Sequence, residues 1–295
     1  MSTASTVSDT SIRPGRQRAP VRHWLRLFGS EIRNVFLRPR NLALLAVVAG
    51  APVFLGLVMW INTPAPGSGG PGAGVFIGQI AENGVFLSLF ALYLLLTVLL
   101  PLAVSVVAGD SVAGEAGLGT LRTLLTVPAG RTRLLLTKYV MIVVFCLTAT
   151  VLVAGFGLLM GVIFFPVGPV TLLSGTTISL AAGLVRLALI AAYVAAALSA
   201  LGAIGLALST FTQHAIAVMA TILVLVIVSE ILDAVSQVAV IHPYLPSHFW
   251  FSFDALLRTP IAWSEVLHGL GSFAAYTVIF GAIAWTRMRR ANVTC

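Results

Sequence analysis

Long apolar runs separated by short polar segments make up most of this chain. The runs occupy residues 41–61, 84–109, 139–165, 184–209, 215–233 and 264–285. About 20 apolar residues in an α-helix are enough to cross the ~30 Å hydrocarbon layer of a bilayer. The pattern therefore predicts an all-α, polytopic membrane protein whose six transmembrane helices form one domain, residues 41–285.

The two ends of the chain are polar or amphipathic. Residues 1–19 are rich in Ser, Thr and Arg without an apolar period, which predicts a disordered cytoplasmic tail. In residues 20–40, apolar side chains recur at helical spacing between arginines, as in amphipathic helices that lie on a membrane surface. Residues 286–295 form a basic cytoplasmic C-terminus. The run 41–61 is longer than a typical signal-peptide core, so we expect it to remain as a span.

The basic residues are distributed unevenly over this layout. The chain is 59% hydrophobic and 9% charged, whereas soluble domains carry about 25% charged residues. Fifteen of the 17 Lys and Arg residues fall in residues 1–40, 110–138 and 286–295, leaving Arg186 and Arg258 on the other side. Because cytoplasmic loops carry such an excess, we expect a bacterial-type inner membrane with both termini in the cytoplasm. The net charge of +8 then reflects topology in a lipid bilayer, and no nucleic-acid partner is expected.

A polar stretch, residues 110–138, separates the second and third runs. Residues 120–127 are predicted to form a short helix that ends before Pro128. Leu121, Leu124 and Leu125 fall at positions i, i+3 and i+4, so they form one apolar stripe. A small amphipathic helix held at the membrane face by two spans is suited to a groove on a soluble partner.

The order of residues in this stretch resembles the signature loop of permease subunits of type-2 ATP-binding-cassette (ABC) exporters. The residues that carry the resemblance are Asp110, Glu115, Gly119, Thr120, Leu121, Leu124, Leu125, Pro128, Arg131 and Lys138. The resemblance implies six spans, cytoplasmic termini and a loop that contacts a separate ATPase. One position departs from the family, because Arg122 follows the Thr-Leu pair where the family often has Glu.

Asp110 and Glu115 are the acidic residues of this stretch. The resemblance implies that they contact the ATPase or order the loop. The alternative is that both are solvated acids near the start of a short helix, where the helix dipole favours negative charge.

The chain has no nucleotide-binding motif of its own. A P-loop needs Gly-Lys-Ser/Thr so that backbone amides and the lysine hold the phosphates. The only lysine, Lys138, follows Thr137 instead. We therefore expect this chain to bind no cofactor, with ATP and Mg²⁺ held by the partner ATPase.

Two acidic residues, Glu230 and Asp233, lie three positions apart and so share a helix face near the outer end of the fifth run. Carboxylates within a membrane are costly and often functional. One interpretation is a polar lining of an exit route, and the other is a solvated helix end. The sequence leaves both open.

The segment before the last run is strongly aromatic. His248, Phe249, Trp250, Phe251 and Phe253 follow Pro246 closely. Asp254 and Arg258 are spaced to pair at i and i+4 on a helix. We predict one or two short helices that dip back into the outer leaflet, where the family resemblance implies re-entrant helices closing the outer end of the path. The alternative, an aromatic belt at the interface, is compatible with this. Candidate path or gate residues are Glu230, Asp233, Phe249, Trp250, Asp254 and Arg258.

Metal and hydrolase chemistry have little support in the sequence. Glu265 and His268 form one E-x-x-H pair, and His242 and His248 lie on the same side of the membrane. Di-iron bundles need two such pairs and two further glutamates, so the sequence predicts no metal site. No Ser-His-Asp order or H-E-x-x-H helix indicates a catalytic residue.

These observations favour a permease subunit of an ABC exporter, without enzyme activity of its own. The partners implied are a cytoplasmic ATPase docking on residues 110–138 and a second permease, as a homodimer or with a related chain. The mostly apolar spans favour a hydrophobic or amphipathic substrate, such as a drug, antibiotic, peptide or lipid-like compound. The alternatives are an ATP-independent carrier and a non-transporting accessory protein.

Overall fold

The computed structural model describes residues 29, 32–33, 35–62, 73–114, 131–172 and 174–290. In these residues the regular secondary structure is helical apart from one very short β-hairpin, which confirms the predicted all-α class. The helices are α2 (Pro39–Ile61), α3 (Ala73–Ile80), α4 (Val85–Thr97), α5 (Leu99–Gly109), α8 (Arg131–Phe164), α9 (Leu180–Ser209), α10 (Ala215–Asp233) and α11 (Trp263–Arg290). A π-helix, η1 (Asp110–Gly114), and two 3₁₀-helices, η2 (Ser236–Tyr244) and η3 (Ser252–Leu257), complete the helical elements, and strands β1 (Val170–Thr171) and β2 (Thr177–Ile178) pair antiparallel.

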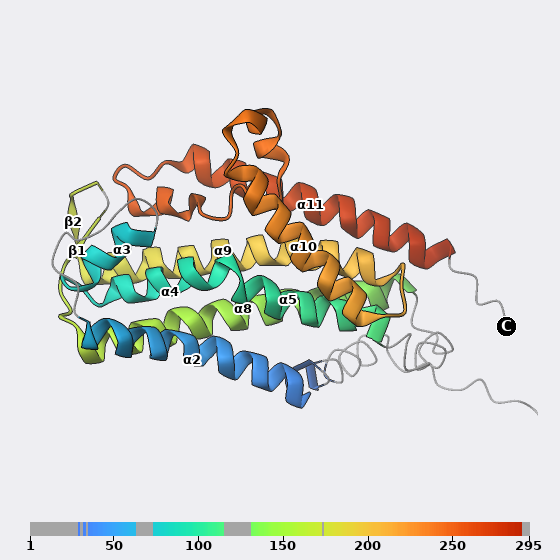
Figure 1. The fold of residues 1–295 in the computed structure, drawn as a ribbon, viewed down its shortest axis with the longest axis horizontal. Helices are drawn as coiled ribbons and strands as arrows, with labels where there is room; N and C mark the ends of the chain where they lie inside the picture. Colours follow the sequence, from blue (N-terminus) through green and yellow to red (C-terminus); the bar gives the residue numbers. More distant parts are fainter. Residues whose placement is uncertain are drawn as a thin grey trace, which may run out of the picture.

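Among the described residues, five helices are long and apolar enough to cross a membrane, and α4 with α5 and η1 makes a sixth if the bent pair is one span. These helices lie side by side along the long axis of the molecule (Figure 1). The spans predicted from the apolar runs correspond to α2, α4 with α5, α8, α9, α10 and α11.

The second span is broken between α4 and α5, with a bend of 54°. Val98 has non-helical dihedrals (φ −139°, ψ −51°), and Pro101 lies in the first turn of α5. Proline has no backbone N–H, so it cannot donate to the carbonyl four residues earlier, that of Thr97. The helix therefore restarts after Val98 rather than running straight through the predicted range 84–109.

Glycines bring α8 into backbone contact with the start of α4. A Cβ atom added to Gly161 would lie 2.1 Å from the carbonyl oxygen of Gly84, and one added to Gly157 would lie 2.8 Å from Cα of Ser88. Small residues four positions apart allow helices to approach this closely.

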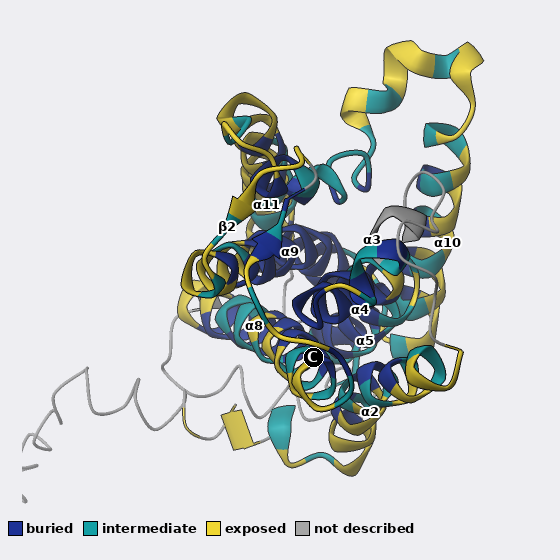
Figure 2. Ribbon diagram, turned by 90° about the vertical axis from the view of Figure 1, so that its left-hand side faces the viewer, coloured by how far each residue is buried: buried dark blue, intermediate teal, exposed yellow. Residues whose placement is uncertain are grey.

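The core of the molecule is built around α9. In the most apolar 18-residue stretch of α9, 78% is buried. The corresponding share is 22% in α2 and in α10 and 17% in α11. Figure 2 shows α4, α5 and α9 as the buried centre, with exposed residues on the outer helices. Large exposed apolar surfaces of this kind suit contact with lipid or with another membrane protein.

Most of the predicted interfacial helix, residues 20–40, lies outside the described residues. Its last part packs on the bundle, because Val35 and Phe36 contact the core and the ring centroid of Phe36 lies 6.3 Å from that of Phe145. The side-chain amide of Asn41 donates a hydrogen bond of 2.8 Å to the carbonyl of Val35. This segment is therefore joined to the beginning of α2.

Candidate functional site

The start of the polar stretch is tied to the beginning of α2 by an ion-pair cluster. The Asp110 carboxylate accepts a short hydrogen bond from the guanidinium of Arg40 and lies 3.6 Å from that of Arg38. Arg40 also donates a weak hydrogen bond of 3.5 Å to the carbonyl of Val106. Asp110 is mostly buried, with 17% of its side chain exposed. It is therefore a fixed contact between two spans.

The π-helix that contains Asp110 also contacts the ends of α9 and α10. The hydroxyls of Ser111 and Ser209 lie 3.3 Å apart. A Cβ atom on Gly109 would lie 3.0 Å from the carbonyl of Ala215, the first residue of α10. Short π-helical segments occur often at functional sites. The polar stretch thus begins where η1 meets α2, α9 and α10.

The other predicted coupling residues are Glu115, Gly119, Thr120, Leu121, Leu124, Leu125 and Pro128, and all of them lie outside the described residues. Arg131 is the first residue of α8, but its side chain is not among those described.

The aromatic segment before α11 is packed onto the helix bundle. Trp250 is 1% exposed and Phe253 is fully buried. The ring of Phe251 lies 4.5 Å, between centroids, from that of Tyr93 in α4. Phe249, one residue before Trp250, is half-buried. Two short helices, η2 and η3, flank the turn that carries Phe249 and Trp250, as predicted.

Arg186 of α9 holds the C-terminal end of this segment by hydrogen bonds. Its guanidinium donates to the carbonyls of Leu256 (2.8 Å) and Arg258 (3.0 Å) and to the hydroxyl of Thr259 (3.3 Å). Asp254 and Arg258 form the predicted i, i+4 pair, 3.2 Å apart. In the sequence, Arg186 counts only as a charge on the outer side. Its position in the first part of an apolar helix was the available signal that it has polar partners.

Two further hydrogen bonds attach the same segment to α9 and α10. The hydroxyl of Tyr193 donates to the carbonyl of Phe249 at 2.7 Å. The hydroxyls of Ser229 and Ser247 lie 2.7 Å apart in a buried position. The segment is therefore held at its beginning by α10, at its middle by Tyr193 and at its end by Arg186.

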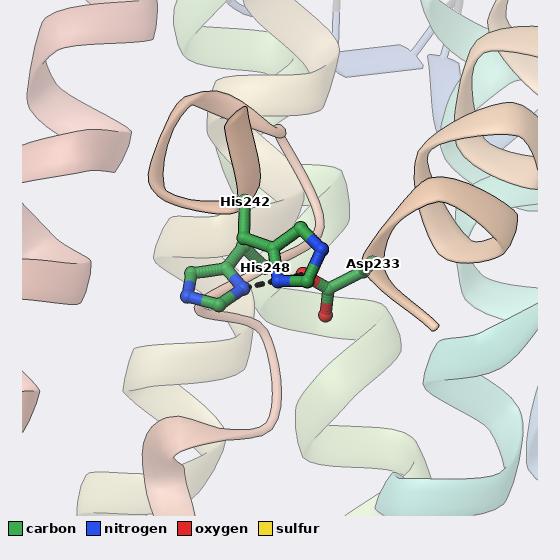
Figure 3. Close-up of side chains that lie close together, drawn as sticks. All are labelled: Asp233, His242 and His248. Atoms are coloured by element: carbon green, nitrogen blue, oxygen red, sulfur yellow. Dashed lines mark hydrogen bonds and ion pairs between the residues drawn. The ribbon is translucent and has the colours of Figure 1, made fainter. Parts of the chain in front are cut away.

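Asp233, the last residue of α10, meets two histidines (Figure 3). Its Oδ1 atom lies 2.5 Å from Nδ1 of His248 and 3.8 Å from Nδ1 of His242. A ring nitrogen of His242, Nε2, lies 3.2 Å from the carbonyl oxygen of Val235. Glu230 lies one turn earlier in α10 and is half-buried. The two acids that share a face of α10 thus have different surroundings, because Asp233 lies next to two imidazoles from the following segment.

The E-x-x-H pair considered in the sequence lies elsewhere. Nδ1 of His268 is 2.6 Å from the carbonyl of Ser264, one turn earlier in α11. Among the described residues, the structure groups Asp233 with His242 and His248, and Glu265 and His268 do not belong to this group. The histidines are nine and fifteen residues after Asp233 and form no familiar motif, so only the fold brings them together.

A protein-family model described as "ABC-2 family transporter protein" matches residues 6–286 of the chain. No curated protein matches it.

Proposed function

The chain belongs to the ABC-2 family of transporter proteins, and from this premise we propose that it is the permease subunit of an exporter driven by a separate ATPase. It is a multi-pass membrane permease, and permeases of this family lack a nucleotide-binding site and work with ATPase subunits. In this proposal the ATPase docks on residues 110–138, and its motion reaches the membrane helices through the start of that stretch.

The observation that carries the proposal is the ion-pair cluster of Asp110 with Arg38 and Arg40. The predicted docking stretch, residues 110–138, starts at this residue, and Asp110 is paired with Arg38 and Arg40 at the start of α2. The adjacent Ser111 contacts Ser209 at the end of α9. A force applied to the stretch by an ATPase is therefore passed directly to α2, α5 and α9.

The break in the second span supplies a place where this force can change the shape of the bundle. α4 and α5 meet at 54°, and Pro101 leaves one backbone hydrogen bond of a straight helix unformed. Hinges are a few element-terminal residues that absorb a change in dihedral angles. ATP binding that favours one angle over another would shift the permease between two states.

The aromatic segment is suited to closing the other end of the path. Arg186 and Ser209 are 23 residues apart on α9, which corresponds to about 35 Å along a helix. The ion-pair cluster on Asp110 and the end of the aromatic segment therefore lie at opposite ends of the bundle. With the termini in the cytoplasm, as the basic residues indicate, the aromatic segment would lie outside. Export is the direction that the resemblance to type-2 ABC exporters implies.

The proposed substrates are hydrophobic or amphipathic compounds, such as drugs, antibiotics, peptides or lipid-like molecules. The outer helices expose large apolar side chains, such as Phe54 of α2, Val224 of α10 and Val278 of α11. A path between two copies, or between this chain and a related permease, would be lined mainly by apolar side chains, which do not bind small ions or sugars well.

Co-purification tests the docking role of residues 110–138. The tagged chain is extracted gently from its own host, beside a Leu121→Asp, Leu124→Asp variant and a matched Thr123→Asp, Thr126→Asp variant with charges off the apolar stripe. We expect a P-loop ATPase to accompany the native chain and the threonine variant and to be lost from the leucine variant. A stable native chain without an ATPase would contradict the proposal and favour a carrier or an accessory protein.

A further inference from the structure

The group at the end of α10 has the composition of a transition-metal site, and we propose that Asp233, His242 and His248 bind one divalent ion of the Zn²⁺ type. One ligand atom from each residue lies within 4.8 Å of the other two. The carboxylate comes from the end of α10 and the imidazoles from η2 and the turn after it (Figure 3). The site lies within one chain, so it does not depend on the proposed transport function.

The distances are close to those that an ion requires. Zinc binds nitrogen and oxygen at about 2.0–2.2 Å, so two ligands of a tetrahedral ion lie roughly 3.4 Å apart. The distance from Asp233 to His242 is 3.8 Å and that to His248 is 2.5 Å. The second is a hydrogen bond, and when Nδ1 of His248 binds the ion, its proton moves to Nε2 or is released to solvent. Side-chain shifts of under about 1 Å bring both distances to the roughly 3.4 Å that separates two ligand atoms of the ion.

His242 is oriented as a metal ligand by a backbone contact. Its Nε2 atom lies 3.2 Å from the carbonyl oxygen of Val235, which can only accept, so Nε2 carries the proton. The lone pair is then on Nδ1, the nitrogen that faces Asp233 at 3.8 Å. Histidine ligands usually donate their second N–H to a carbonyl or carboxylate in this way, which fixes the tautomer.

The donor set selects the class of ion. Two imidazoles and one carboxylate suit Zn²⁺ and its first-row neighbours, whereas Mg²⁺ and Ca²⁺ prefer oxygen ligands throughout. The side chains of His242, His248 and Asp233 are 16%, 29% and 31% exposed. This partial exposure leaves room for a water molecule as fourth ligand and for entry of the ion.

A bound ion would join α10 to the beginning of the aromatic segment. His248 lies two residues before the buried Trp250 and one after Ser247, which already contacts Ser229 of α10. Because an ion bound only in the folded arrangement stabilises that arrangement, zinc should hold this part of the segment against α10.

The test uses the full chain with a tag that contains no histidine, purified in detergent and treated with a chelator. All samples carry Cys295→Ser to remove a competing thiol. Zinc binding is measured by titration calorimetry and by metal content after dialysis. The decisive variant is His242→Ala, because it removes one ligand and leaves the 2.5 Å bond between His248 and Asp233. His268→Ala is the matched control, since its Nδ1 contacts only its own helix.

We expect one zinc per chain in the parent and in His268→Ala. His242→Ala should lose at least about tenfold in affinity, because even the loss of an outer-shell partner costs 10–100-fold. Zinc should raise the unfolding temperature of the parent and of His268→Ala equally, and that of His242→Ala by less, each measured against the same chain without metal.

Three outcomes overturn the site: no zinc bound by the parent, equal binding by His242→Ala, or equal loss in both variants. Each would leave Asp233, His242 and His248 as a hydrogen-bonded cluster only. None of them bears on the ATPase, because co-purification is measured without zinc.

Discussion

Gly161→Ala is the substitution whose effect follows most directly from the structure. Its Cβ atom would lie 2.1 Å from the carbonyl oxygen of Gly84, while ordinary contact begins at 3.4 Å. The obstacle is backbone, and Gly84 has no side chain that could move aside. The start of α4 and the end of α8 would therefore have to separate by about 1.3 Å, the difference between these two distances.

The separation has two energetic costs. Forcing an extra carbon into a packed interior typically costs ~1–3 kcal/mol. The same displacement strains the hydrogen bond from the amide of Gly84 to the carbonyl of Pro166, now 2.9 Å, and losing such a bond costs ~0.5–1.5 kcal/mol. Together these give an expected loss of about 1.5–4.5 kcal/mol in the free energy of unfolding.

Gly155→Ala provides the control on the same helix. A Cβ atom on Gly155 would meet nothing within 4 Å, so this variant makes the same change in helix propensity without the collision. The free energy of unfolding is measured for both variants in detergent or bicelles by denaturant titration. If Gly161→Ala is as stable as Gly155→Ala, the backbone contact between α4 and α8 does not exist as described.

The remaining predictions concern the ion pair of Asp110, the hydrogen bonds of Arg186 and the bend at Pro101. In a double-mutant cycle of Asp110→Asn and Arg40→Gln, we expect a coupling energy of only ~0.5–1 kcal/mol, because Arg40 is 48% exposed, but a clear loss of ATP-driven transport in either single variant. Arg186→Ala removes three hydrogen bonds and should raise hydrogen exchange of residues 246–262, whereas Arg258→Ala, which removes an exposed pair, should change it little. Pro101→Ala restores a backbone donor and should reduce the 54° bend, measured as a longer spin-label distance between the two ends of the span; an unchanged distance would show that packing alone sets the angle.

The parts of the fold that follow from local pattern could be predicted from the sequence. Apolar runs predict spans because a helix must satisfy its own backbone in lipid. The pair of Asp254 and Arg258 follows from helical spacing, and the contact of α8 with α4 follows from the spacing of Gly157 and Gly161. Each of these signals lies within one element.

The features that the sequence did not reveal depend on contacts between elements. The break at Val98 falls inside an apolar run, where hydropathy does not change, so only Pro101 hinted at it. The pairing of Asp110 with Arg40 joins residues 70 positions apart. Asp233 and the histidines after it are brought together by η2 and the turn that follows it, next to the buried Trp250.

The distribution of polar contacts limits how the two ends of the protein can communicate. Ser111 contacts the last residue of α9, and Arg186 in the first turns of α9 holds the end of the aromatic segment. Between them α9 is largely buried against α4, α5, α8 and α11. A close-packed helix of this kind shifts as a unit, because interiors at crystal-like density resist local compression. We therefore expect a displacement at Ser209 to reach Arg186 as a movement of the whole helix, so that α9 would connect the proposed ATPase-docking stretch to the aromatic segment.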